Sequence, residues 1–181
     1  MLQFPKPYAD AVARLRVPSG FLIVVVFAWL SNPTAGSLAA GLPIAALGLG
    51  LRAWAAGCLA KNQQLATGGP YAYTRNPLYI GTLLVAAGLV VAARNVWLGA
   101  LFAAVFLFVY LPVIQLEEQH LRRLFPDYAR YAESVPALVP RLTPWKEKSL
   151  NPFRGSQYLK NQEYQAAIGF AVGVLFLLWR M

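Results

Sequence analysis

The chain has 181 residues, of which 58% are hydrophobic and only 13% are charged. This composition, with its long uncharged runs, excludes an ordinary soluble domain and indicates a membrane protein with room for one compact bundle. The net charge of +9 suits an anionic membrane surface, so we expect anionic lipids and no nucleic acid as partners. The lone Cys58 excludes an internal disulfide, and its apolar surroundings predict no metal site.

Five apolar stretches are candidates for membrane spans, because a helix needs about 20 residues to cross the hydrocarbon core. The first, residues 17–31, is short, and residues 8–16 extend it at helical spacing. It also fits the hydrophobic region of a signal peptide, but no clean cleavage site follows, so we favour a span. The other four are residues 37–59, 77–93, 96–116 and 164–179. We therefore predict an all-α, polytopic membrane helix bundle of about five transmembrane helices, forming a single domain over residues 1–181.

The positions of the basic residues predict the orientation of the bundle, because cytoplasmic loops carry an excess of lysine and arginine. Of the 16 lysines and arginines, only Arg94 and Arg180 fall on the side opposite to the N-terminus. We therefore expect a cytoplasmic N-terminus and an external C-terminus. The polar motifs described below then face the cytoplasm.

A polar and aromatic loop precedes the third span and reads GGPYAYTRNPLYIG over residues 68–81. Arg75 comes just before Pro77 at the first turn of a helix, and a cation beside a helix N-terminus attracts a carboxylate or phosphate. The alternative is an ordinary interfacial loop, in which Tyr71 and Tyr79 anchor the chain and Arg75 reaches toward water. For the loop as a whole we favour function.

Glu117 and Glu118 come at the end of the fourth span, which carries no charge before them. Carboxylates in this position can bind an ammonium group or ribose hydroxyls, or accept a proton. The alternative is that they only mark the end of the span. From Glu117 onward, apolar residues at helical spacing predict an amphipathic cytoplasmic segment on the membrane, bent at Pro126, that is placed to cover a site at the span ends.

Gly48 and Gly50 lie inside the second span, in the sequence Gly-Leu-Gly. Small residues in membrane helices most often allow two helices to approach closely. The same lack of side chains would also admit a flat cofactor against the backbone. Arg52 is an intramembrane charge in need of a partner, and the Glu117–Glu118 pair offers a candidate.

Taken together, these elements resemble the superfamily of membrane methyltransferases that includes isoprenylcysteine carboxyl methyltransferases and phosphatidylethanolamine N-methyltransferases. The pattern of that superfamily is GPY, RHPxYxG, EE and YxxYxxxVPxxxP. This chain matches it at residues 69–71, 75–81, 117–118 and 128–140, within a core of residues 37–141. Asn76 replaces the usual His, so it keeps hydrogen-bonding capacity but cannot titrate. The last span, residues 164–179, lies beyond the core and is left unexplained.

The resemblance implies an enzyme that uses S-adenosylmethionine to methylate a lipophilic acceptor entering from the bilayer at the cytoplasmic face. Arg75 is expected to hold the cofactor carboxylate, and a tyrosine to pack against the adenine or the sulfonium. The expected catalytic residues are Arg75, Glu117 and Glu118. The expected cofactor-binding residues are Gly48, Gly50, Tyr71, Arg75, Asn76, Pro77, Tyr79, Glu117, Glu118 and Tyr131.

Two other functions fit the same residues. Membrane sterol reductases share a related C-terminal pattern and use NADPH, although the double glutamate and the small size favour the methyltransferase. A non-enzymatic membrane scaffold, in which arginine and tyrosine only anchor the chain at the interface, would bind no cofactor. For a methyltransferase, the sequence leaves the acceptor open among isoprenylated proteins, phospholipid amines, quinone-like lipids and small thiols.

Overall fold

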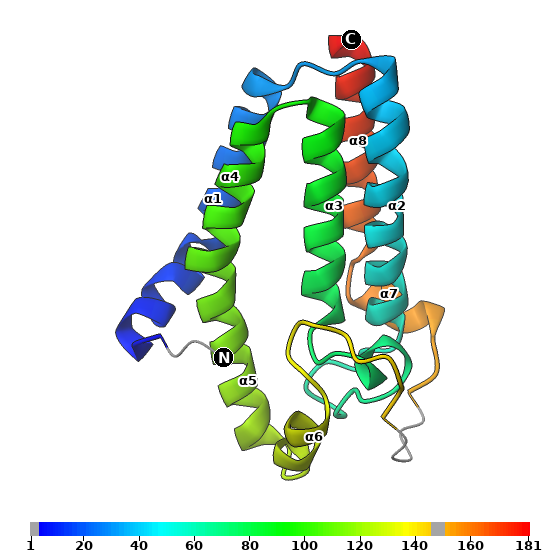
Figure 1. The fold of residues 1–181 in the computed structure, drawn as a ribbon. Helices are drawn as coiled ribbons and strands as arrows, with labels where there is room; N and C mark the ends of the chain where they lie inside the picture. The colour runs from blue at the N-terminus through cyan, green and yellow to red at the C-terminus, as the bar shows by residue number, and fades with distance from the viewer. Residues whose placement is uncertain (1–3, 146–150) are drawn as a thin grey trace. The chain divides into compact units, whose positions relative to one another are not determined.

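The computed structural model describes residues 4–145 and 151–181, and every regular element in these two ranges is helical (Figure 1). The predicted all-α class is therefore confirmed for the described chain. The α-helices are α1 (Lys6–Leu30), α2 (Ala35–Gly57), α3 (Pro77–Ala93), α4 (Val96–Val105), α5 (Leu111–Leu124), α6 (Tyr128–Ser134), α7 (Gly155–Lys160) and α8 (Tyr164–Arg180). A short 3-10 helix, η1 (Gly69–Ala72), precedes α3, and a π-helical segment, η2 (Phe106–Tyr110), joins α4 to α5.

Five of these helical runs are apolar, in agreement with a membrane helix bundle. The helix Ala35–Gly57 and the continuous run Val96–Leu124 are long and apolar enough to cross a membrane. The bent helix α1 is a third if its two halves form one span. Helices α3 and α8 have 17 residues each, which is the lower end of the length that spans the hydrocarbon core.

Helix α1 contains Pro18, and its two halves, Lys6–Leu15 and Val17–Leu30, meet at 52°. Proline lacks the amide hydrogen that a helix needs at that position, and its ring collides with the carbonyl four residues earlier, so a bend is expected there. The predicted extension of the first span by residues 8–16 is confirmed, because α1 is helical from Lys6 onward.

The fourth span continues further than predicted, because one helical run extends from Val96 past residue 116 to Leu124. The π-helical turn η2 lies inside this run, just before Pro112. In a regular α-helix the ring of Pro112 would collide with the carbonyl of Phe108, and the wider π-helical turn relieves that collision. That carbonyl instead accepts a hydrogen bond of 2.7 Å from the hydroxyl of Tyr8 on α1. The run ends just before Pro126, where the sequence predicts a bend, and α6 follows.

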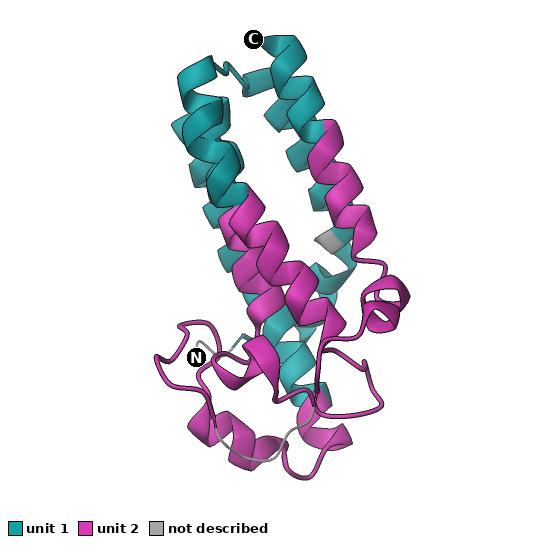
Figure 2. Cartoon of the chain, turned by 90° about the vertical axis from the view of Figure 1, so that its right-hand side faces the viewer, with its two compact units in different colours: residues 1–45, 86–120, 173–181 teal, residues 46–85, 121–172 magenta. Residues whose placement is uncertain are grey.

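The chain divides into two compact units, which Figure 2 shows in different colours. Unit 1 comprises residues 1–45, 86–120 and 173–181, and unit 2 comprises residues 46–85 and 121–172. Helices α2, α3, α5 and α8 each contribute residues to both units.

In unit 1, α1 packs against α4 and η2, and the turns between helices are fixed by hydrogen bonds. The amide of Asn32 donates to the carbonyl of Ala93 at 2.9 Å, and the side chain of Asn95 caps α4 by accepting from the amide of Trp97. Leu38, Ala92 and Leu177 form the buried apolar centre of this unit. Leu177 belongs to α8, so the last helix is part of the packed bundle.

Helices α2 and α3 approach each other closely at paired glycines in each unit. In unit 1, a methyl group added to Gly41 would collide with the backbone of α3 at Gly88. In unit 2, a methyl group added to Gly48 would lie 2.6 Å from the carbonyl oxygen of Gly81. Small residues at a membrane helix contact allow this approach and maximise van der Waals packing.

Candidate functional site

The loop between α2 and α3 is shaped by a glycine and a proline at the start of η1. Gly69 has a φ of +56°, in the left-handed region that favours glycine, and a Cβ atom there would lie 2.8 Å from the sulfur of Cys58. Pro70 follows and is buried, as are Tyr71 and Ala72. The Gly-Pro-Tyr sequence therefore folds this loop tightly against the end of α2.

Backbone hydrogen bonds join this loop to the segment that follows α6, far away in the sequence. The amide of Arg75 donates to the carbonyl of Pro136 at 2.9 Å. Two further amides of the later segment donate in the opposite direction. They are Arg141 to the carbonyl of Tyr73 at 3.0 Å and Trp145 to the carbonyl of Ala72 at 2.9 Å. Residues 69–77, with the Gly-Pro-Tyr and Arg-Asn-Pro sequences, and residues 128–140, with the YxxYxxxVPxxxP sequence, thus lie side by side in unit 2.

Side chains reinforce the same contact, and all of them donate to backbone carbonyls. The hydroxyl of Tyr131 donates to Tyr71 at 2.7 Å, and the hydroxyl of Thr74 donates to Ala137 at 3.0 Å. The side-chain amide (Nδ2) of Asn76 also donates to the carbonyl of Ala137, at 3.0 Å. Asn76 therefore uses its hydrogen-bonding capacity to hold the two segments together, a role that needs no titration.

Arg75 lies at the centre of this joined structure, directly before the N-terminus of α3. Its side chain is half-buried, and its Nη1 atom donates to the carbonyl of Ala132 at 2.9 Å. The planar N–H groups of a guanidinium match the geometry of a carboxylate or a phosphate. The helix N-terminus beside it adds a partial positive charge. This end of unit 2 therefore has the donor chemistry of an anion-binding site.

The predicted aromatic residues are largely buried. Tyr71 is 6% exposed and packs with Ala55, Cys58 and Ala66, and Tyr79 is 7% exposed. Tyr131 is 2% exposed, packs edge-on against Tyr128, and contacts the ring of Trp145 at 5.3 Å between centroids. Pro77 is fully buried at the first turn of α3. For Tyr131 the structure shows a packing and hydrogen-bonding role, and contact with a cofactor stays a prediction for all three tyrosines.

The two glycines of the Gly-Leu-Gly sequence have different surroundings. Gly48 faces α3, where an added methyl group would meet the backbone of Gly81 and Val85 at 2.6 Å. Gly50 is exposed, and an added methyl group would meet nothing within 4 Å. The close-packing interpretation thus holds for Gly48. The backbone at Gly50 is the part of this motif that is open to approach.

Glu117 and Glu118 belong to α5 and to unit 1, whereas the other predicted site residues belong to unit 2. Glu117 is exposed, Glu118 is half-buried, and its Oε1 atom is buried. Both residues lie inside the helix, which ends at Leu124. Over the described residues, no group of three or more His, Cys, Asp or Glu side chains gathers where it could hold a metal ion.

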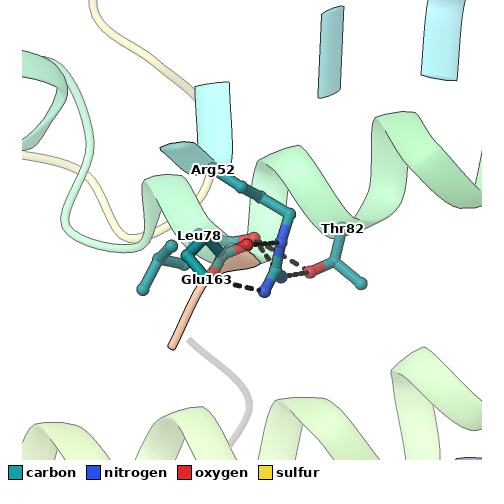
Figure 3. A network of polar contacts seen from close by, with 4 residues as sticks. All are labelled: Arg52, Leu78, Thr82 and Glu163. Carbon is teal, nitrogen blue, oxygen red and sulfur yellow. Dashed lines mark hydrogen bonds and ion pairs between the residues drawn. The ribbon is translucent and has the colours of Figure 1, made fainter. Parts of the chain in front are cut away.

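The partner of Arg52 is not the one suggested by the sequence. Arg52 forms a two-bond ion pair with Glu163, at 2.5 Å from Nε to Oε1 and 3.0 Å from Nη2 to Oε2 (Figure 3). Its Nη1 atom also donates to the hydroxyl of Thr82 at 2.5 Å. The proposed pairing of Arg52 with Glu117 or Glu118 was therefore wrong. A signal for the observed pair existed, because Glu163 is an acidic residue placed directly before the last apolar run.

Comparison with known proteins gives independent evidence from the sequence. The sequence profile of the phospholipid methyltransferase family matches residues 37–128, about half of the chain. The chain belongs to this family. The matched range includes the Gly-Leu-Gly sequence, the Arg75 loop and the glutamate pair, and it ends at the first tyrosine of the YxxY motif.

Three named proteins are similar in sequence to this chain, over 56%, 67% and 77% of its length. The cobalt-zinc-cadmium resistance protein CzcN of Cupriavidus metallidurans is 36% identical over 56% of this chain and 47% of its own length. The nickel-cobalt-cadmium resistance protein NccN of Alcaligenes xylosoxydans is 34% identical over 67% of this chain and 56% of its own. The protein-S-isoprenylcysteine O-methyltransferase of Schizosaccharomyces pombe is 32% identical over 77% of this chain and 61% of its own. The chain thus spans about half the length of these relatives, and no solved structure matches it.

Proposed function

We propose that this protein is an S-adenosylmethionine-dependent membrane methyltransferase that methylates a lipophilic acceptor. The observation that carries the proposal is the joining of the Arg75 loop to the YxxYxxxVP segment in unit 2. The Arg75 amide and guanidinium both bond to that segment, through Pro136 and Ala132. Membership of the phospholipid methyltransferase family and similarity to an isoprenylcysteine O-methyltransferase support the reaction class.

The donor set of the candidate site suits the polar groups of this cofactor. Arg75 would bind the carboxylate through its guanidinium, beside the N-terminus of α3. Glu117 or Glu118 would accept hydrogen bonds from the amino group or from the ribose hydroxyls, because an ionised carboxylate is a hydrogen-bond acceptor. The exposed backbone at Gly50 would allow a flat group to approach α2. When bound, the cofactor supplies an electrophilic methyl group on its sulfonium.

Methyl transfer from a sulfonium needs positioning and a dry site more than covalent help from the protein. The buried Tyr71 and Tyr79 would exclude water near Arg75. If the acceptor is an amine, Glu117 or Glu118 would take its proton, whereas a carboxylate acceptor needs no base.

The acceptor would enter sideways from the bilayer, with its apolar tail among lipid chains and its reactive head at the end of the spans that carries Arg75. By the positive-inside rule this end would face the cytoplasm, since the order of the predicted spans in the sequence leaves only Arg94 and Arg180 for the other side. The basic residues near this end would also attract anionic lipids.

Titration of the detergent-purified protein with S-adenosylmethionine, S-adenosylhomocysteine and NADPH tests this proposal. We expect micromolar binding of the first two ligands and none of NADPH, and we expect a Glu118→Ala variant to lose that binding. Binding of NADPH alone would place the protein with the sterol reductases. Absence of binding to all three, in detergent and in lipid nanodiscs, would favour a scaffold.

A further inference from the structure

The end of α2 is closed by a segment that lies outside the family-matched range. The last carbonyls of a helix have no partners within it and must find them elsewhere. The side-chain amide of Asn161 donates to the carbonyls of Ala56 at 2.9 Å and Leu59 at 2.8 Å. The amide of Arg154 donates to the carbonyl of Gly57 at 2.9 Å. The segment before α8 therefore completes the hydrogen bonding at this end of α2.

The Arg52–Glu163 pair extends this connection to α3. The stem of Arg52 passes over Gly81, where a Cβ atom would lie 2.5 Å from the Cγ atom of Arg52. Its guanidinium then reaches Thr82 and the carbonyl of Leu78, in the first turns of α3 (Figure 3). The hydroxyl of Thr82 in turn donates to the carbonyl of Leu78 at 2.9 Å. A single network thus joins α2, α3 and the residue preceding α8.

The ion pair is shielded from water, with side-chain exposures of 23% for Arg52 and 8% for Glu163. Removing one member of such a pair leaves the other charge without compensation in an apolar environment. The first turn of α3, which this network holds, begins at Pro77, two residues after Arg75. A disturbance of the pair would therefore be transmitted to the candidate site within two or three residues.

We propose that Glu163 is a positioning residue for the candidate site. By holding Arg52 against Leu78 and Thr82, it fixes the first turn of α3 and so the Arg75 loop. The segment before α8, which lies outside the matched family range, would then be required for the reaction. This inference rests on the proposed function for its catalytic part, and on the described contacts alone for its structural part.

The chemical accessibility of the Cys58 thiol reports how the loop at η1 packs against α2, and it can be measured without a ligand. It is the single cysteine of the chain, it is 4% exposed, and its sulfur lies against Gly69 at the start of η1. Because Tyr71 of η1 packs against Cys58, separation of the loop from α2 would expose the thiol to a maleimide. The rate of Cys58 labelling in the native protein therefore measures how firmly the loop is held.

The test compares Glu163→Gln with Glu133→Gln, which makes the same chemical change at an exposed glutamate of α6 in the same unit. We expect Glu163→Gln to raise the Cys58 labelling rate and to lower the kcat of methyl transfer, each by about tenfold or more. Glu133→Gln should leave both unchanged. Glu163→Asp keeps the charge, so its Cys58 labelling rate and its kcat should both lie between those of Glu163→Gln and the wild-type protein. If Glu163→Gln does not fold, Glu163→Asp is compared with Glu133→Gln in its place.

A double variant separates positioning from simple charge compensation. Arg52→Gln combined with Glu163→Gln removes both charges, so the midpoint of thermal unfolding should return close to that of the wild-type protein. Because the Arg52 bonds to Leu78 and Thr82 are also removed, Cys58 labelling should stay fast, kcat should stay low, and the KM for S-adenosylmethionine should rise as Arg75 is displaced. Full recovery of kcat in the double variant would overturn the positioning role.

Two further outcomes are informative. Equal behaviour of Glu163→Gln and Glu133→Gln in both measurements would overturn the inference as a whole. If the wild-type protein transfers no methyl group, the proposed function fails by itself. The Cys58 labelling rates then still decide whether Glu163 holds the loop.

Discussion

Replacing Arg75 with Ala is expected to weaken the binding of S-adenosylmethionine by about 30-fold or more, because losing one partner of a buried charge-assisted pair costs about 2 kcal/mol or more. Arg75 is the cation at the N-terminus of α3, and both its amide and its guanidinium are bound to the segment after α6. Arg75→Lys should lose most of this affinity as well, because an ammonium cannot bind a carboxylate with two parallel hydrogen bonds. Titration calorimetry of the purified variants measures the effect.

Arg141 supplies the matched control for this experiment. Its guanidinium also donates to a backbone carbonyl of the segment 128–140, that of Ser134 at 2.8 Å, but this bond is exposed. Arg141→Ala therefore removes a comparable bond without removing the cation beside α3, and it should keep the wild-type affinity. If Arg75→Ala binds the cofactor as tightly as Arg141→Ala does, Arg75 does not hold the cofactor.

Replacing Gly48 with Ala is expected to destabilise the bundle by about 1–3 kcal/mol, because overpacking forces helices apart. The added methyl group would lie 2.6 Å from backbone atoms of Gly81 and Val85, which cannot move aside as a flexible side chain can. The midpoint of thermal unfolding in detergent should fall by on the order of 5 °C. Cofactor affinity should fall with it only to the extent that the folded fraction falls.

Gly50→Ala is the control for this prediction, because an added methyl group at Gly50 meets nothing within 4 Å. This variant should unfold at the wild-type temperature or slightly above, since alanine favours a helix more than glycine does. If it nevertheless weakens cofactor binding, Gly50 lies at the cofactor. Equal thermal midpoints for the two variants would contradict the account of the α2–α3 contact.

The helical architecture could be predicted from the sequence because hydrophobic runs of about 20 residues have few alternatives to a membrane helix. The break near Pro126 was also predictable, since proline leaves a helix little choice. The close approach of α2 and α3 at Gly48 was one of two interpretations of the Gly-Leu-Gly sequence. Only the packing partner, Gly81, decides between them.

The contacts around the candidate site could not be predicted, because most of them use backbone carbonyls. Thr74, Asn76, Tyr131 and the Arg75 guanidinium all donate to main-chain oxygens, and every residue carries such an oxygen. A sequence therefore shows the donors but not their acceptors. The choice of Glu163 over the Glu117–Glu118 pair as the partner of Arg52 is of the same kind, because it depends on which helix ends meet in space.

Methyl transfer to a lipophilic acceptor can be measured with methyl-labelled S-adenosylmethionine and the protein in nanodiscs made from a whole-cell lipid extract. We expect label to appear in the organic-soluble fraction at a rate that depends on Arg75 and that S-adenosylhomocysteine lowers. Label that stays entirely with the water-soluble cofactor, in a protein that binds it tightly, would contradict a lipophilic acceptor in that extract. No transfer and no binding by a correctly folded protein would contradict the methyltransferase itself.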